Sequence, residues 1–226
     1  MHTIEPLTYL VDGDAGALQG MACLLQAAGL RVAAFDRTDG FLQAHDPATP
    51  GCAVIDVRSP GRNGRNGPDG LDGLALLREL RHGGAERAVV FVTGGGDIEL
   101  GVRAMKAGAV DFLIKPLEAA GFIAAVRHAL ARDAHERAVR RELQRIRAHL
   151  DTLTRREQQV LRHVVSGRLN KQIAFDLGIA EKTIKVHRAR VMEKMGATSL
   201  AQLVRETLEL EAGAVFAGDG VDKDGS

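Results

Sequence analysis

The stretch CAVIDVRSP, residues 52–60, indicates the fold of the first half of the chain. Its apolar run ends at Asp56 and Pro60 follows, which is the pattern of a short buried strand that stops at an acidic residue. Similar runs recur in the first 126 residues, and they predict strands at 7–11, 31–35, 53–57, 89–93 and 110–114, the second being the weakest. Helical patterns at 15–28, 71–81, 98–107 and 118–131 lie between them. This alternation predicts a doubly wound parallel sheet of the α/β class.

Four polar residues stand at the ends of these predicted strands: Asp12, Asp56, Thr93 and Lys115. The carboxyl ends of parallel strands meet at one edge of the sheet, where ligands bind. Asp56 has the chemistry of a nucleophile for a phosphoryl group, and Lys115, Thr93 and a divalent metal could balance the charge of that group. Charged residues also end strands for structural reasons, so spacing alone leaves both readings open.

Length and composition point to two domains in a globular chain. The 226 residues are 45% hydrophobic and 26% charged, which excludes collagen-like and disordered classes. No apolar run is long enough to span a membrane and no signal-type segment opens the chain, so we expect a cytoplasmic protein. The only two cysteines, Cys23 and Cys52, are far apart in sequence, which excludes a disulfide framework and a four-ligand zinc site.

Charge is distributed unevenly along the chain. Residues 1–126 hold 11 basic and 15 acidic residues, a net charge of −4, whereas residues 127–212 hold 18 and 11, a net charge of +7. A basic rear half indicates a domain that binds a polyanion.

The rear half is helical throughout, with helices predicted at 155–166, 170–176, 181–195 and 199–209. Thr154 and Glu157 form a capping-box pattern before the first of them. The turn around Gly178 joins the second and third as a helix-turn-helix, so the third helix is the predicted DNA reader. Residues 213–226 are rich in Gly and Asp and are expected to be disordered.

A charged helical segment, residues 127–150, connects the two predicted domains. Its apolar residues are spaced 4, 3, 4 and 3, as in a coiled-coil seam, at Val139, Leu143, Ile146, Leu150 and Leu153. The pattern covers barely two heptads, so a dimerising linker and a helix that lies on a neighbouring domain are both open.

Residues 7–126 resemble the receiver domain of two-component response regulators, which has the flavodoxin- or CheY-like strand order 2-1-3-4-5. The matching motifs are Val11-Asp12, residues 55–60, Val92-Thr93-Gly94, and residues 105–116. The resemblance implies that Asp56 accepts a phosphoryl group from a histidine kinase, with Mg²⁺ held by Asp12 and Asp56. It also implies a switch formed by Thr93 and Phe112, contact of Lys115 with the phosphoryl group, and a cis peptide bond between Lys115 and Pro116.

One position departs from the receiver pattern. The family usually has two adjacent acids after the first strand, whereas this chain has Asp12 followed by Gly13. Loss of one carboxylate is expected to weaken Mg²⁺ binding, because such ions are held by oxygen ligands and charge. Asp14 is a candidate replacement ligand, and a receiver that works without phosphorylation is the alternative.

The rear half is similar to the LuxR-type DNA-binding domain of FixJ- and NarL-type regulators, through residues 153–157, Val160-Leu161, Gly167, residues 170–174 and residues 183–188. The resemblance implies contacts to bases or phosphates from Lys182, Lys185, Val186 and Arg190, and to the DNA backbone from Lys171, Thr183 and Arg188. It also implies a dimer interface on the last helix, which contains Leu200, Leu203 and Val204. A solvated charged face and a packed apolar core are the alternatives for these two sets. Ala180 replaces the usual capping serine, so the reader helix is expected to fray at its start.

Together these features predict a receiver domain at 1–126, a helical linker at 127–150 and a four-helix DNA-binding domain at 151–212. We expect a transcription regulator, not an enzyme, that forms homodimers when Asp56 is phosphorylated. Its expected partners are a histidine kinase, double-stranded promoter DNA and RNA polymerase, and no membrane. A less favoured alternative is a haloacid-dehalogenase-type phosphatase that uses Asp12. The long loop at 61–70, beside Asp56, has no predicted role.

Overall fold

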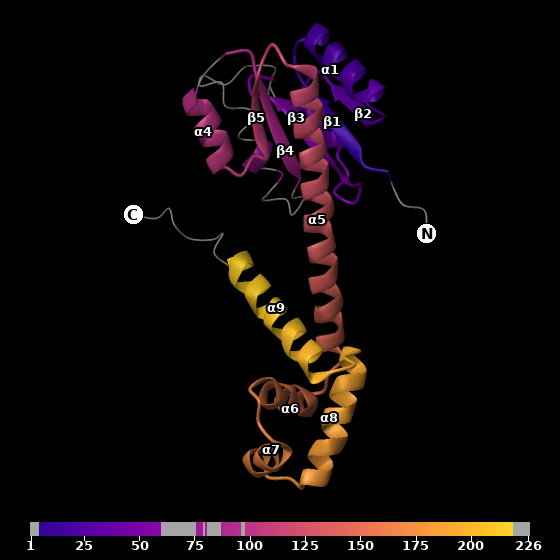
Figure 1. Cartoon of the computed structure of the whole chain (residues 1–226), viewed down its shortest axis with the longest axis vertical. Coiled ribbons are helices and arrows are strands. Elements are labelled where there is room, and N and C mark those ends of the chain that lie inside the picture. The colour runs from indigo at the N-terminus through magenta and orange to yellow at the C-terminus, as the bar shows by residue number, and fades with distance from the viewer. Residues whose placement is uncertain (1–4, 60–75, 79, 81–86, 96–97, 219–226) are drawn as a thin grey trace. The chain divides into compact units, whose positions relative to one another are not determined.

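The computed structural model describes residues 5–59, 76–78, 80, 87–95 and 98–218 (Figure 1). The chain forms two compact units, Met1–Arg137 and Ala138–Ser226. The predicted loop at 61–70 and most of the predicted helix at 71–81 lie outside the described residues.

The first unit contains a five-stranded sheet in the order β2-β1-β3-β4-β5, and every neighbouring pair is parallel. This confirms the predicted doubly wound fold and its strand order. The strands are β1 (Leu7–Val11), β2 (Arg31–Phe35), β3 (Gly51–Asp56), β4 (Ala88–Thr93) and β5 (Asp111–Ile114). β4 is buried along its whole length, whereas β2 is at the edge and half exposed, which explains its weak sequence pattern.

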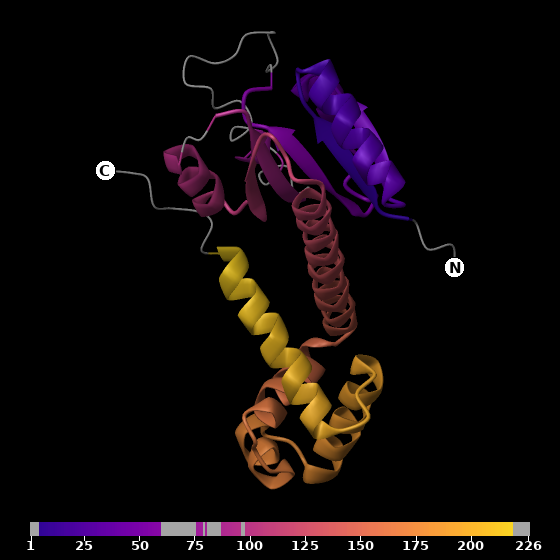
Figure 2. The same ribbon diagram turned by 45° about the horizontal axis from the view of Figure 1, so that its top comes forward.

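Helices cover both faces of this sheet (Figures 1 and 2). On one face α1 (Ala15–Ala27) and the start of α5 (Ala119–Asp151) pack through Leu25 and Phe122. On the other face α2 (Thr38–Ala44) and α4 (Ile98–Lys106) contribute Phe41 and Ala104. The helix α2 is not predicted from the sequence, because its seven residues are too few to show a helical period.

A single helix, α5, runs through both the predicted last receiver helix and the predicted linker. The first unit continues along it to Arg137, past the expected boundary at residue 126. The Asp133 carboxylate accepts a hydrogen bond from the Gly51 backbone N–H at 2.9 Å, and Arg137 pairs with Asp133 at 2.8 Å and donates to the Thr49 carbonyl at 3.0 Å. These contacts fasten α5 to the start of β3.

The second unit contains the end of α5 and four further helices: α6 (Arg155–Val165), α7 (Asn170–Leu177), α8 (Glu181–Met195) and α9 (Leu200–Gly218). The Thr154–Glu157 capping box is present, and Gly178 ends α7 with φ of 63°. Both sequence predictions are therefore confirmed. α9 differs from expectation, because it continues to Gly218 where a disordered tail was expected from residue 213. Alanines at 212, 214 and 217 favour this longer helix.

The end of α5 belongs to the core of the second unit. Ile146 and Leu153 are buried there with Val160, Ile173 and Ile184, whereas Val139 is exposed. The sequence left open whether the apolar seam forms a dimerising linker or packs on a neighbouring domain. Its second half, from Ile146 to Leu153, packs into the core of the second unit.

Candidate functional site

Four predicted site residues meet at the carboxyl edge of the sheet. Asp12 follows β1, Asp56 and Thr93 end β3 and β4, and Lys115 follows β5. The Lys115 ammonium donates to Asp12 Oδ2 at 2.6 Å and to Asp56 Oδ2 at 2.7 Å. Parallel strands bring these residues together although they are far apart in sequence.

Every carboxylate oxygen of this pair has a hydrogen-bond donor. Asp12 Oδ1 accepts from the Asp14 backbone N–H at 2.9 Å, and Asp56 Oδ1 accepts from the Arg58 backbone N–H at 2.8 Å. Burial alone lowers the pKa of Lys115, but its hydrogen bonds with Asp12 and Asp56 outweigh burial and raise that pKa. The ammonium is thus held charged beside two carboxylates, and the three groups carry a formal charge of about −1.

Thr93 and Phe112 lie in different environments. Thr93 is fully buried, and its Oγ1 accepts a 3.4 Å hydrogen bond from the Gly95 backbone N–H. Phe112 is half-buried and packs against Gly101 of α4, where an added Cβ would approach its ring to 3.1 Å. The Lys115-Pro116 peptide bond is cis, as the resemblance implies.

Sequence reasoning missed two residues next to Asp56. The Arg58 guanidinium lies close to Gly95, where an added Cβ would approach its Nη2 to 3.1 Å. The Ser59 hydroxyl is buried and donates to the Val11 carbonyl at 3.1 Å. The sequence feature that could have identified them is their position, two and three residues after the predicted phosphoacceptor Asp56.

The candidate metal ligands are Asp12 and Asp56. Asp14 is the N-cap of α1, and its Oδ1 accepts from the backbone N–H groups of Ala17 and Gly16, which lower its pKa. Within the described ranges no cluster of three His, Cys, Asp or Glu side chains could hold a metal. Mg²⁺ is usually held by one or two carboxylates plus water and phosphate oxygens, so the Asp12–Asp56 pair fits this ion.

The predicted reader helix, α8, has one buried face and one exposed face. Ile184, Val191 and Met195 are buried, so residues on the opposite side of the helix face solvent. The exposed set contains most of the predicted DNA contacts: Lys182, Thr183, Lys185, Val186 and Arg190. Lys171, on α7, is exposed as well. The structure therefore leaves these side chains accessible to a ligand.

Arg188 and Ala180 occupy special places around α8. The half-buried Arg188 guanidinium donates to Asn170 Oδ1 at 3.1 Å and so ties α8 to the start of α7. Ala180 makes no side-chain cap, as expected. Glu181 in the first turn pairs with Lys185 at 3.7 Å. An acid near the positive end of a helix partly compensates for a missing cap.

The predicted dimer residues on α9 are divided between its two faces. Leu203 is fully buried in the core of the second unit, so its assignment to an interface was wrong. Leu200, Val204 and Leu208 lie on the other face and line a shallow apolar groove. The error arises because Leu203 and Val204 are adjacent in sequence and point about 100° apart on a helix.

Comparisons with known proteins bear on both units. Residues 9–127 match the response regulator receiver domain, and residues 151–207 match the bacterial regulatory proteins of the luxR family. The chain belongs to the response regulators. These matches confirm the resemblance of both units to their families, and they favour a response regulator over the phosphatase alternative.

Relatives of this response regulator cover nearly its full length. It is 43% identical to the transcriptional regulatory protein FixJ of Azorhizobium caulinodans over 200 aligned residues. The alignment covers 88% of this chain and 90% of that protein. It is 39% identical to nodulation protein W of Bradyrhizobium diazoefficiens, over 92% of this chain and 88% of that protein. The solved structure of response regulator StyR matches with a TM-score of 0.78 and 39% identity, over 91% of this chain and 99% of that one.

The family assignment establishes the general activity of this response regulator. It is a DNA-binding transcription regulator of a two-component system, a class that acts with histidine kinases and DNA. Receiver domains of this class bind Mg²⁺ at the phosphorylation site. No helix in the described part of the chain is long and apolar enough to cross a membrane.

Proposed function

We propose that a histidine kinase phosphorylates this regulator on Asp56, and that phosphorylation promotes homodimerisation and promoter binding. The observation that carries the proposal is the Asp56 carboxylate at 2.7 Å from the Lys115 ammonium, at the carboxyl edge of a receiver sheet. DNA is the target, so the regulator acts in the cytoplasm, and RNA polymerase is its proposed protein partner at the promoter.

The residues of the pocket define how the transfer proceeds. An Asp56 oxygen attacks the phosphorus of a phosphohistidine, the P–N bond breaks, and the leaving imidazole nitrogen takes up a proton. Lys115 already bridges Asp12 and Asp56, and its charge opposes the charge on the transferred group. Bound Mg²⁺, held by Asp12 and Asp56, supplies charge neutralisation at the phosphoryl oxygens.

Thr93 and Phe112 connect the pocket to the surface. Thr93 is buried and directly follows Val92, the register partner of Asp56 on the neighbouring strand, and its hydroxyl donates to the new phosphoryl oxygens. Phe112 then moves inward against α4, whose exposed Val102 and Met105 form part of the receiver surface that pairs. In the second unit, the outward face of α9 pairs two DNA-bound domains, and α8 of each reads one half-site.

Gly13 supports a second candidate, a receiver that regulates DNA binding without phosphorylation. Gly13 offers no carboxylate, and Asp14 Oδ1 is engaged in the helix cap. With fewer ligands the ion is held less tightly, and transfer slows.

Intact-mass measurement after incubation with acetyl phosphate and Mg²⁺ separates the two candidates. We expect the mass of the wild type to rise by one phosphoryl group and the mass of Asp56→Asn to stay unchanged. Asp46→Asn, which removes an acid at the opposite edge of the sheet, is the control and should gain the same mass as the wild type. No gain in the wild type, together with no binding of beryllofluoride, would overturn phosphorylation and favour the second candidate.

A further inference from the structure

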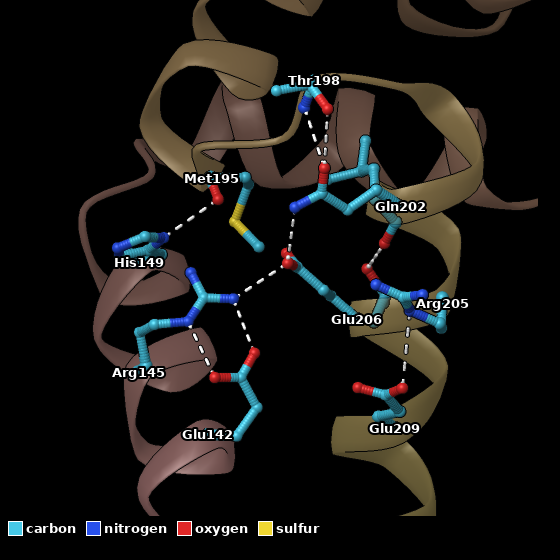
Figure 3. Close-up of polar contacts among 11 residues, drawn as sticks. Glu142, Arg145, His149, Met195, Thr198, Gln202, Arg205, Glu206 and Glu209 are labelled. Carbon is cyan, nitrogen blue, oxygen red and sulfur yellow. Dashed lines mark hydrogen bonds and ion pairs between the residues drawn. The ribbon is translucent and has the colours of Figure 1, made fainter.

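The end of α5 and the middle of α9 are joined by a polar cluster inside the second unit (Figure 3). Arg145 on α5 is its centre. Its Nη2 donates to Glu206 Oε1 on α9 at 2.9 Å and to Glu142 Oε1 at 2.8 Å, and its Nε donates to Glu142 Oε2 at 3.1 Å. Gln202 Nε2 also donates to Glu206 Oε1, at 3.0 Å.

Glu206 depends on this cluster because it lies in the protein interior. Its side chain is 3% exposed, and its second oxygen, Oε2, has no hydrogen-bond partner among the described residues. A carboxylate removed from water is stable only when a cation or several donors compensate it. Among the residues that the structure describes, Arg145 is the cation that contacts it.

The same end of α5 also contacts the reader helix. His149 Nδ1 lies 2.9 Å from the Met195 carbonyl, at the last residue of α8. The next residue, Gly196, has φ of 65°, and an added Cβ would come within 3.4 Å of the His149 ring. The last turns of α5 thus contact both the DNA-reading helix and α9.

The two faces of α9 have different surroundings. Leu203 and Glu206 face the core, whereas Leu200, Val204 and Leu208 line the outward apolar groove. Both faces belong to one rigid helix, so a rotation of α9 that follows loss of the Arg145 contact moves the outward groove as well.

We propose that Arg145 and Glu206 are positioning residues that hold α9 in the orientation required for two DNA-bound domains to pair. The proposal rests on the proposed pairing through α9. It predicts that the ion pair matters for binding paired half-sites and matters little for binding one half-site, since α8 itself is not altered.

Full-length Arg145→Met and Glu206→Gln, alone and combined, test this, with Arg141→Met on the exposed side of α5 as the matched control. All proteins are first incubated with acetyl phosphate and Mg²⁺, because pairing is proposed to follow phosphorylation. Wild-type protein then selects a duplex with two half-sites from a random-sequence pool, and a second duplex retains one half-site. The readout is the ratio of the two dissociation constants. We expect Arg145→Met to reduce the paired-site advantage by about five- to tenfold, and single-site affinity to change by less than about twofold.

Three further readouts check the origin of the effect. The double variant should lose no more than Arg145→Met alone, because the two residues act as one unit. Arg145→Lys, which keeps the charge, should recover part of the loss. Hydrogen exchange of α9 backbone amides should rise in Arg145→Met and stay at the wild-type rate in Arg141→Met.

Two results would overturn the proposal. One is an unchanged ratio in folded Arg145→Met, and the other is an equal fall in paired-site and single-site affinity, which shows that the pair only maintains the fold. Wild-type protein without any paired-site advantage would instead refute the proposed pairing itself, and the positioning role with it.

Discussion

The pocket around Asp56 and the proposed DNA-binding surface of α8 depend on different kinds of neighbours. In the pocket, Lys115 contacts Asp12 and Asp56 from 103 and 59 residues away. On α8, the exposed contacts come from one helix between Lys182 and Arg190. The pocket therefore depends on the whole sheet, and its residues are coupled to one another. The reader surface depends on helical period, and its residues act almost independently.

The largest effect is expected where this coupling is strongest. Lys115→Met removes the cation that neutralises two carboxylates, and we expect the rate of phosphorylation by acetyl phosphate to fall by about 10²- to 10³-fold. Lys106→Met, on the exposed side of α4, is the control. Time-resolved intact mass measures the rate, and a fall of less than threefold, about 0.6 kcal/mol, would show that Lys115 is dispensable.

A smaller effect is expected for a single residue of the reader surface. Lys185→Ala should weaken binding to the selected duplex by about 1–3 kcal/mol and lower the salt dependence by about one ion. Fluorescence anisotropy at several salt concentrations measures both. Phosphorylation should proceed at the wild-type rate, and unchanged affinity would place the DNA surface elsewhere on the domain.

Restoring the missing acid sharpens the contrast from the receiver side. Gly13 is not among the described glycines with positive φ, so a side chain there would not force a left-handed backbone. Gly13→Asp should tighten Mg²⁺ binding by about tenfold, since it adds a third carboxylate to the pair formed by Asp12 and Asp56. Isothermal titration with Mg²⁺ tests this, and Asp14→Asn should leave the wild-type constant within twofold. A larger loss in Asp14→Asn would make Asp14 a ligand.

The smallest effect concerns Glu157, which anchors the second unit. Lys194 donates to it at 2.7 Å, and this bond, with the Thr154 backbone N–H, lowers the pKa of Glu157 from 4.5 to about 2. The folded pKa is below the unfolded one, so the stabilisation is complete above about pH 4.5 and is lost as the pH falls toward 2. Glu157→Gln should cost about 1 kcal/mol at pH 7.

Urea unfolding of the second unit from pH 7 to pH 3, monitored by helical circular dichroism, measures this dependence. The difference between wild type and Glu157→Gln should shrink as the pH falls below about 4.5. The exposed Glu193→Gln is the matched control and should show no such convergence. A difference that is independent of pH would contradict the lowered pKa.

The sheet and the pocket were predictable because both follow from local patterns and one topological rule. Apolar runs identify the strands, and parallel strands place Asp12, Asp56, Thr93 and Lys115 at one edge. The alternation of buried Ile184 with exposed Lys185 and Val186 likewise follows from helical period.

The residues that were missed make contacts without any period. Asp133, Arg137 and Arg145 look like ordinary charges on a solvated helix, and only the folded chain shows Gly51, Thr49 and Glu206 opposite them. Leu203 was misassigned for the same reason. An apolar residue on the last helix can face the core or a partner, and only packing distinguishes the two.

The bond between Asp133 and Gly51 also bears on how the regulator is made. Gly51 has φ of 150°, and any side chain there would come within 1.9 Å of the Leu7 carbonyl, so β1 and β3 close tightly at this point. Asp133, whose carboxylate binds the Gly51 backbone at this junction, is translated 82 residues after Gly51. A nascent chain stalled just beyond residue 126 thus has every strand of the sheet yet lacks Asp133 and its bond to Gly51. Synthesis of the receiver is completed only when the ribosome has released Asp133 and Arg137.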